Sequence, residues 1–152
     1  MDKQVTFTIF VKWIITIGTL IREFNINTDQ SDVKRILEKA FNTTVSFDNY
    51  TDNKTVYVLE VDNKIVATAT LVIVNKFIHN GSSMGLIEDV ATDESTRGKG
   101  YASLLIKELI EISKLFDCYK VILNCDDSLV PFYEKNGFMK SGSLMRINLT
   151  NG

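Results

Sequence analysis

The sequence contains few of the residues that staple a chain or interrupt its regular structure. Its 152 residues include one proline, two cysteines and one histidine. Cys118 and Cys125 are too few for the disulfide framework of a small secreted domain, and a chain of this length can fold by burial alone, so we expect both to be reduced. Repeats, low-complexity tracts and proline- or serine-rich linkers are also lacking, which predicts a single domain over residues 1–152.

Charge of one sign does not dominate the chain either. Seventeen basic and nineteen acidic residues give a net charge of −2, which argues against a surface that binds phosphate backbones. We therefore expect no nucleic-acid partner. Hydrophobic residues make up 45% of the chain and charged residues 24%, as in average globular proteins, so intrinsic disorder is not predicted.

No apolar run is long enough to span a membrane. The most apolar segment, residues 5–21, is interrupted by Lys12 and by four threonines, whereas a spanning helix needs about 20 mostly apolar residues. No small-residue cleavage site follows it. We predict a strand over residues 5–10 and then a helix, because apolar residues recur at helical spacing from Trp13 to Phe24. We expect no membrane partner and a cytoplasmic location.

Helical and strand patterns alternate along the rest of the chain, which predicts an α/β (α+β) protein with a mixed sheet. Thr28 or Asp29 is the expected N-cap of a second helix, whose apolar stripe runs from Val33 to Phe41. Two β-branched runs, residues 56–61 and 65–74, are joined by a turn typical of a hairpin. The other expected elements are strands over residues 86–92, 120–125 and 138–149, and helices over residues 101–116 and 128–136.

A glycine-containing loop, Arg97-Gly98-Lys99-Gly100-Tyr101-Ala102, opens the longest expected helix. Glycines let backbone amides approach a diphosphate, and the first helical turn adds unpaired N–H groups and the positive end of the helix dipole. The loop lacks the pattern of a nucleoside-triphosphate loop. Ser103 occupies the place of the third glycine of a dinucleotide fingerprint. The residues favour an anion site, and an ordinary glycine-containing turn is the alternative.

Two further classes of protein are not supported. Gly81-Ser82-Ser83-Met84-Gly85 satisfies the G-x-S-x-G pattern of a hydrolase elbow, but a strand is expected after it instead of a helix. The only histidine, His79, lies upstream of this motif instead of downstream. The two cysteines have no neighbouring histidine, so they cannot assemble a four-ligand zinc site locally. We predict neither a serine hydrolase nor a metal site.

The segment Ile87-Glu88-Asp89-Val90-Ala91-Thr92 and the glycine loop together resemble the fourth strand, the R/Q-x-x-G-x-G/A loop and the third helix of the GNAT superfamily of acetyltransferases. Further blocks within residues 76–138 are similar to the glucosamine-6-phosphate N-acetyltransferase family. These blocks are residues 76–79, 85–89, 117–123, 125–126 and 132–138. The resemblance implies the GNAT fold, a central mixed twisted sheet that is flanked by helices and splayed between its fourth and fifth strands.

The resemblance also implies acetyl-CoA as co-substrate, no metal, and a homodimer. Acetyl-CoA would lie in the splay, with the backbone of residues 90–92 on its pantetheine arm and the loop amides on its pyrophosphate. The N–H of Val90 would polarise the thioester carbonyl, and Tyr133 would protonate the leaving thiolate. The implied cofactor-binding residues are Val90, Ala91, Thr92, Arg97, Gly98, Lys99, Gly100, Tyr101, Ala102, Ser103, Asn124, Asp126 and Tyr133.

The acceptor that the resemblance implies is glucosamine 6-phosphate, acetylated to N-acetylglucosamine 6-phosphate in the pathway to UDP-N-acetylglucosamine. A carboxylate would accept the amine proton directly or through water. The implied catalytic residues are Glu88, Asp89, Asn124 and Tyr133. The implied substrate-binding residues are Lys76, His79, Glu88, Asp89, Tyr119, Lys120, Arg146 and Asn148.

The sequence departs from the family's pattern around the acceptor. Asn75, Asn124 and Asn148 replace charged residues, and Arg146 precedes the position of the phosphate-binding arginine by two residues, on the same face of a strand. Another amino sugar or small amine therefore stays open as the acceptor, and a catalytically weak CoA-binding protein stays open as an alternative of another class. The structural alternatives are a solvated pair for Glu88 and Asp89, core packing for Tyr133, and a hydrogen-bonded structural role for His79.

Overall fold

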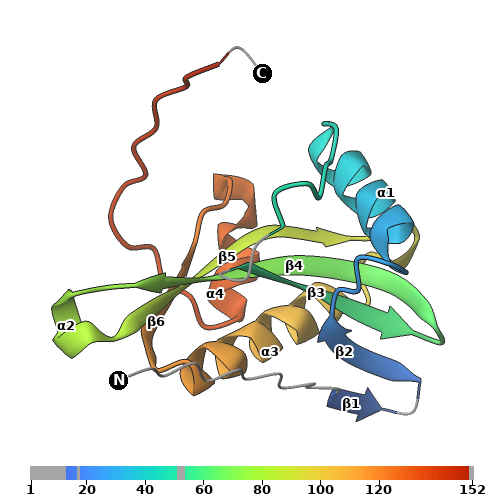
Figure 1. Ribbon diagram of the computed structural model, residues 1–152, viewed down its shortest axis with the longest axis horizontal. Coiled ribbons are helices and arrows are strands. Elements are labelled where there is room, and N and C mark those ends of the chain that lie inside the picture. Colours follow the sequence, from blue (N-terminus) through green and yellow to red (C-terminus); the bar gives the residue numbers. More distant parts are fainter. Residues whose placement is uncertain (1–12, 17, 51–53, 151–152) are drawn as a thin grey trace.

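The computed structural model describes residues 13–16, 18–50 and 54–150, and it has a six-stranded sheet with helices on both faces (Figure 1). The strands are β1 (Trp13–Thr16), β2 (Thr19–Glu23), β3 (Lys54–Val61), β4 (Lys64–Asn75), β5 (Ser83–Thr92) and β6 (Cys118–Leu123). The helices are α1 (Gln30–Phe41), α2 (Ile78–Gly81), α3 (Tyr101–Leu115) and α4 (Val130–Lys135), with 3-10 turns η1 (Glu94–Thr96) and η2 (Asp127–Leu129). Neighbouring strands are antiparallel except for the parallel pair β5 and β6, which confirms the predicted mixed sheet.

The helix expected over residues 13–24 is wrong, because residues 13–16 and 19–23 form the antiparallel pair β1 and β2. Gly18 lies before β2 with a φ of 85°, and its carbonyl accepts a hydrogen bond from the amide of Asp62 at 2.8 Å. Pairing of β2 with β3 leaves Ile21 only 1% exposed. The segment is so rich in apolar β-branched residues that its spacing suits a strand as well as a helix. The strand expected over residues 5–10 lies outside the described residues.

Helix α1 confirms the second expected helix and covers one face of the sheet. Its buried side chains are Val33, Ile36 and Leu37, and they pack with Phe24, Val56, Val58, Ile65 and Ala91. Phe41, at the end of the expected stripe, is 49% exposed. Asp29 is the residue before the helix, as expected, but its carboxylate accepts hydrogen bonds from Arg22 and from the amide of Asn25 and makes no cap bond.

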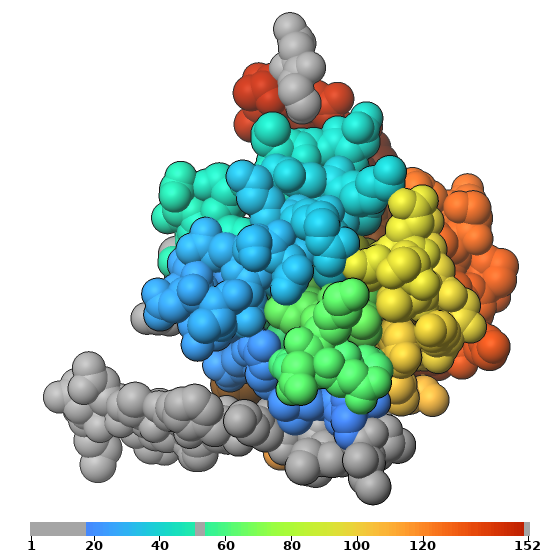
Figure 2. Space-filling view, turned by 90° about the vertical axis from the view of Figure 1, so that its right-hand side faces the viewer, coloured from blue at the N-terminus to red at the C-terminus, as the bar shows by residue number. Residues whose placement is uncertain are grey.

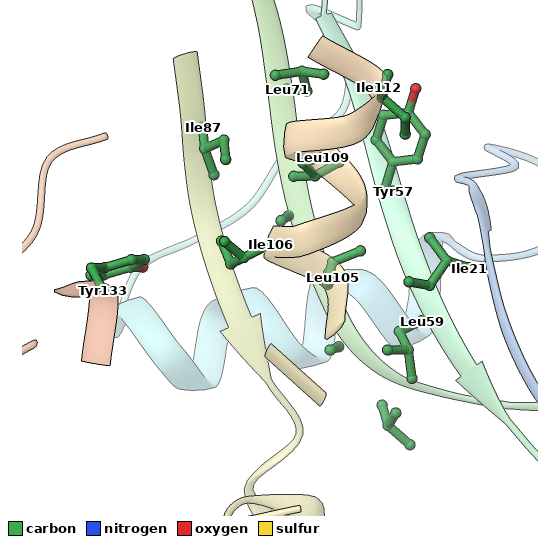
Figure 3. Packing of buried hydrophobic residues seen from close by; sticks show 13 residues of the cluster. Ile21, Tyr57, Leu59, Leu71, Ile87, Leu105, Ile106, Leu109, Ile112 and Tyr133 are labelled. Carbon is green, nitrogen blue, oxygen red and sulfur yellow. The ribbon is translucent and has the colours of Figure 1, made fainter. Parts of the chain in front are cut away.

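Helix α3 fills the opposite face. Leu105, Ile106 and Leu109 are 0% exposed, and burying each contributes roughly 1.5–3 kcal/mol. Figure 3 shows these side chains directed at the sheet, with Tyr133 of α4 at the margin of the same cluster. Phe116, expected on the buried stripe, is 48% exposed because the helix ends at Leu115. None of the helices in the described residues has the length and apolar composition needed to cross a membrane.

Gly85 allows α3 to approach β5 closely. A Cβ at Gly85 would lie 2.8 Å from the hydroxyl of Ser113 and 3.3 Å from Val121, while Ser113 is fully buried and donates to the carbonyl of Leu109 at 2.7 Å. We expect Gly85→Ala to lower the free energy of unfolding by about 1–3 kcal/mol through overpacking. Urea denaturation measures this loss. Adding Ser113→Ala removes the hydroxyl oxygen nearest to the new Cβ. If the double variant loses as much free energy of unfolding as the two single variants together, the overpacking explanation is contradicted.

The C-terminal part follows the prediction only as far as Gly137. Pro131 lies in the first turn of α4, and Gly137 follows the helix with a φ of 93°. The strand expected over residues 138–149 is wrong for the isolated chain: residues 139–150, which we call the C-terminal tail, form no strand. Lys140 still pairs with Asp127 at 3.1 Å, and the tail then runs away from the body (Figure 1). The strand expected over residues 120–125 is β6, but β6 is only half-buried. It is the last strand of the described sheet, so it has no neighbour to cover its outer edge.

Candidate functional site

Strand β5 contains a β-bulge where it pairs with β4. Two of its residues, Asp89 and Val90, lie opposite the single residue Ala69 of β4. Asp89 has a φ of 52°, the left-handed conformation with which a bulge accommodates its extra residue. A bulged strand has backbone groups that its neighbour cannot pair, so the bulge offers hydrogen-bonding groups to a ligand.

The bulge also changes which face the side chains occupy. Ile87 packs in the cluster of α3, whereas Ala91 packs in the cluster of α1. In a regular strand residues four apart lie on one face, so the bulge reverses the phase between them. Glu88 alternates with Ile87 and is therefore on the face of α1. Its side chain is exposed, yet partial burial of the carboxyl and the charge of Asp89 raise the pKa of Glu88 above its ordinary value.

Strands β5 and β6 separate next to the bulge. Their parallel pairing ends at Ile87 and Leu123, although β5 continues to Thr92. Residues 88–92 therefore have one edge that no described strand pairs. The N–H and C=O groups of such an edge need other partners, and an extended amide-containing ligand can supply them. This is the splay implied between the fourth and fifth strands of the family, because the family's fourth strand is β5 here.

The glycine loop lies between β5 and α3. Gly98 and Gly100 both have a φ of 80°, and a Cβ on either would meet nothing within 4 Å. Gly100 is the N-cap of α3, so the first amides of a 15-residue helix follow it and remain unpaired within the helix. Residues 97–100 are exposed. The open backbone at a helix N-terminus fits a diphosphate, as the sequence predicted for this loop.

The structure brings together part of the expected acceptor site. The rings of His79 and Tyr119 stack with centroids 4.0 Å apart, and the ammonium group of Lys120 lies 5.3 Å from the centre of the Tyr119 ring. Residues of α2 and of β6, distant in sequence, thus form one cationic and aromatic cluster. Lys76, at the end of β4, is half-buried.

Tyr133 lies in the core, in the cluster of α3. Its ring makes edge contacts with Phe132 and Phe138, at centroid distances of 4.9 and 5.8 Å. Burial and the neighbouring Cys125 raise the pKa of the Tyr133 hydroxyl, which keeps its proton in place at neutral pH. The core-packing interpretation is therefore correct, and it is compatible with a hydroxyl that donates a proton.

Residues 21–138, which include the splayed sheet, the bulge and the glycine loop, match the acetyltransferase (GNAT) family. The chain belongs to this family. A curated relative, the glucosamine 6-phosphate N-acetyltransferase of Trypanosoma brucei brucei, is 46% identical over 86 residues, which are 57% of this chain and 58% of the relative. The chain spans about half the length of the first curated relatives it matches, between 52% and 58%.

Solved structures agree with the GNAT fold. The crystal structure of glucosamine-6-phosphate N-acetyltransferase from Arabidopsis thaliana has a TM-score of 0.75 and 28% identity, over 87% of this chain and 99% of that chain. The crystal structure of a Trypanosoma brucei acetyltransferase has a TM-score of 0.77 and 34% identity, over 86% of this chain and 99% of that chain. The GNAT fold expected from the sequence is confirmed.

Four other predicted site residues of this GNAT chain lie outside the His79 and Tyr119 cluster. Asn124 and Asp126 are exposed. They follow Leu123, the residue at which β6 stops pairing with β5. Arg146 and Asn148 are on the exposed C-terminal tail, which runs away from the sheet (Figure 1). Within one chain the structure therefore does not bring Arg146 to the cluster of His79 and Tyr119. Among the described residues, no three His, Cys, Asp or Glu side chains gather as metal ligands would.

Sequence reasoning missed the residues that hold the start of the glycine loop. Asp93 accepts hydrogen bonds from the amide and the hydroxyl of Ser95 at 3.0 and 2.8 Å, and its carboxylate is 2.7 Å from the guanidinium of Arg35 on α1. An Asp two residues before a Ser is a recognisable turn signal. The partner on α1, however, is 58 residues away in sequence.

Proposed function

We propose that this chain is an acetyl-CoA-dependent N-acetyltransferase and that glucosamine 6-phosphate is its acceptor. One observation carries the proposal: the bulge, the free edge of β5 and the open glycine loop at the start of α3 lie along one stretch of chain, residues 88–102. The names of the relatives supply the acceptor. The reaction would belong to UDP-N-acetylglucosamine synthesis, in the cytoplasm.

The residues present fit acetyl-CoA. The pyrophosphate would lie over Gly98 and Gly100, where a side chain at either position would otherwise fill the open space. The amides of residues 98–102 would bind it, with Arg97, Lys99 and Ser103 around them. The free edge of residues 90–92 would pair with the pantetheine arm, beside Asn124 and Asp126. Acetyl-CoA would supply the acetyl group as a thioester.

The reaction is a direct transfer to the amine. Glu88 accepts the amine proton, directly or through water, and its raised pKa makes it a better base than an ordinary glutamate. The N–H of Val90 donates to the thioester oxygen as negative charge develops there. The new bond joins the amine nitrogen to the acetyl carbon, the carbon–sulfur bond breaks, and the hydroxyl of Tyr133 gives its proton to the departing sulfur.

Comparing the rates of acetyl transfer to glucosamine 6-phosphate and to glucosamine tests whether the acceptor is the phosphorylated sugar. Lys76, Lys120 and His79 supply cationic and polar groups for a phosphate, so we expect kcat/KM for the phosphorylated sugar to exceed that for glucosamine by about tenfold or more, as charge-assisted contacts require. Steady-state assays that follow CoA release measure both sugars. Equal values would redirect the proposal to a neutral amino sugar or small amine. CoA binding without turnover of any amine would favour a catalytically weak CoA-binding protein.

We also propose a homodimer in which the C-terminal tail packs on a second copy of the chain. The tail exposes Met145, Ile147 and Leu149 by 81–88%, an alternating apolar row of the kind that a strand buries. The outer edge of β6 has no partner among the described strands. Sedimentation equilibrium should give twice the chain mass for the full chain and a lower mass once residues 139–152 are removed.

Arg146 would then reach an acceptor site through this tail. Asn148 follows Arg146 by two residues, so the two side chains lie on the same face of an extended chain. The guanidinium of Arg146 suits a phosphate because it donates two parallel hydrogen bonds. We expect Arg146→Ala to raise the KM for glucosamine 6-phosphate by about tenfold and to leave that for glucosamine nearly unchanged. Asn148→Ala removes a neutral side chain from the same face, so it should raise this KM less than Arg146→Ala does. The same rise for both sugars would argue against a phosphate contact.

A further inference from the structure

Asp93 fixes the beginning of the glycine loop. Its amide donates to the carbonyl of Val66 on β4 at 2.7 Å, and its carbonyl accepts from the amide of Thr96 at 2.9 Å. Its carboxylate accepts from both the amide and the hydroxyl of Ser95. One residue therefore joins the sheet to the 3-10 turn η1, which leads into the loop.

Arg35 extends this connection to helix α1. Its guanidinium donates to the carboxylate of Asp93 at 2.7 Å, with the Arg35 side chain 55% exposed and the Asp93 side chain 15% exposed. Figure 2 shows the segment that contains Asp93, in yellow, against α1, in blue and cyan, and a hollow of about 450 Å³ lies between them. One turn further along α1, Lys39 lies 3.6 Å from Glu94, with both side chains at least 60% exposed.

We propose that Arg35 and Asp93 are a positioning pair that holds the glycine loop in the conformation that binds the diphosphate of CoA. This inference rests on the proposed function. The far end of the loop is already fixed, because Leu105 and Leu109 anchor α3 in the core. Between these two ends, residues 97–100 are exposed and contain two glycines, so their backbone has many accessible conformations when unanchored.

A loop that is fixed before binding loses less conformational entropy when the ligand arrives. Loosening its first end should therefore weaken CoA binding without changing the chemical step. The contact also persists over the working pH range. Hydrogen bonds from Ser95 and the charge of Arg35 lower the pKa of Asp93 to about 2, so its carboxylate stays ionised at every pH well above that value, and the effect of the pair on CoA affinity should not vary between pH 6 and pH 8.

Calorimetric titration of the full chain with CoA tests the proposal. We expect Arg35→Ala to raise the Kd for CoA by roughly three- to tenfold, the size that positioning residues outside a site commonly show. Arg35→Lys retains a cation and should recover most of the affinity. Lys39→Ala, the matched control on the same helix, should change the Kd less than twofold, because its 3.6 Å contact is longer than the 2.7 Å contact of Arg35 and its partner Glu94 is far more exposed than Asp93. At saturating acetyl-CoA the kcat of Arg35→Ala should match the parent.

A double-mutant cycle of Arg35→Ala and Asp93→Asn shows whether Arg35 positions the loop through Asp93 or contacts the ligand directly. If Arg35 acts through Asp93, adding Arg35→Ala to Asp93→Asn causes little further loss of affinity. An undiminished further loss would overturn the proposal and would assign Arg35 to the ligand phosphates. An unchanged Kd in Arg35→Ala, or an equal rise in Lys39→Ala, would overturn it as well. A parent chain that does not bind CoA would refute the proposed function itself, so the two failures are distinguishable.

Discussion

Replacing Gly100 with aspartate should weaken CoA binding by at least about 100-fold while the protein stays folded. Two like charges about 4 Å apart near a protein surface repel by about 4 kcal/mol, which is more than two decades in Kd. A Cβ at Gly100 meets nothing within 4 Å in the free protein. Its φ of 80° is in the left-handed region, where Asp and Asn are tolerated better than other side chains.

Two control variants separate charge, bulk and backbone strain. Gly100→Asn adds almost the same volume without a charge, so its loss of CoA affinity should be smaller than that of the aspartate variant. Gly81→Asp introduces the same side chain at a φ of 77°, also into open space, but in α2 instead of the loop, and should leave the Kd for CoA unchanged. Calorimetry measures all three. A folded Gly100→Asp variant with parental CoA affinity would remove the loop from the cofactor site.

Tyr133→Phe should lower kcat by about 100-fold if the hydroxyl protonates the departing thiolate, since a general acid contributes at least that factor. The substitution keeps the ring, which packs edge-on against Phe132 and Phe138, so stability and CoA affinity should change little. Burial raises the pKa of this hydroxyl, so the donor remains protonated throughout the neutral range and is not lost by titration there.

Tyr57→Phe is the matched control for this variant. Tyr57 is also a buried tyrosine of the α3 cluster, 5% exposed compared with 8% for Tyr133, and burial likewise raises the pKa of its hydroxyl. Its loss should affect stability and leave kcat close to the parent. Single-turnover kinetics ensure that chemistry is the measured step. Parental single-turnover rates in Tyr133→Phe would leave Tyr133 with only its role in the core.

Local patterns in the sequence were sufficient for most of the elements. The β3–β4 hairpin was predicted because Asp62 and Asn63 suit a turn in which both residues have positive φ, here 49° and 64°. The apolar stripe of residues 101–116 predicts helix α3. These signals depend on residues close together in the chain, so they do not require knowledge of what packs on them. The same is true of the glycine loop.

Other features depend on partners that are distant in sequence. Residues 13–16 and 19–23 are paired strands because β3 offers β2 an edge to pair with, not because of their own spacing. The bulge at Asp89 depends on the register with β4, in which the single residue Ala69 lies opposite Asp89 and Val90. The C-terminal tail has a strand-like pattern but no neighbouring strand in its own chain.

The sequence by itself determined the α/β class, the hairpin, the long helix with its glycine loop, and the resemblance to GNAT acetyltransferases. Only the tertiary structure decided the phase reversal at the bulge, the stack of His79 on Tyr119, the position of Arg146 on a free tail, and the ion pair of Arg35 with Asp93. The physical reason is that turn preferences and helical periodicity act within a few residues, whereas strand register and ion pairing are free energies of contacts between segments that folding brings together.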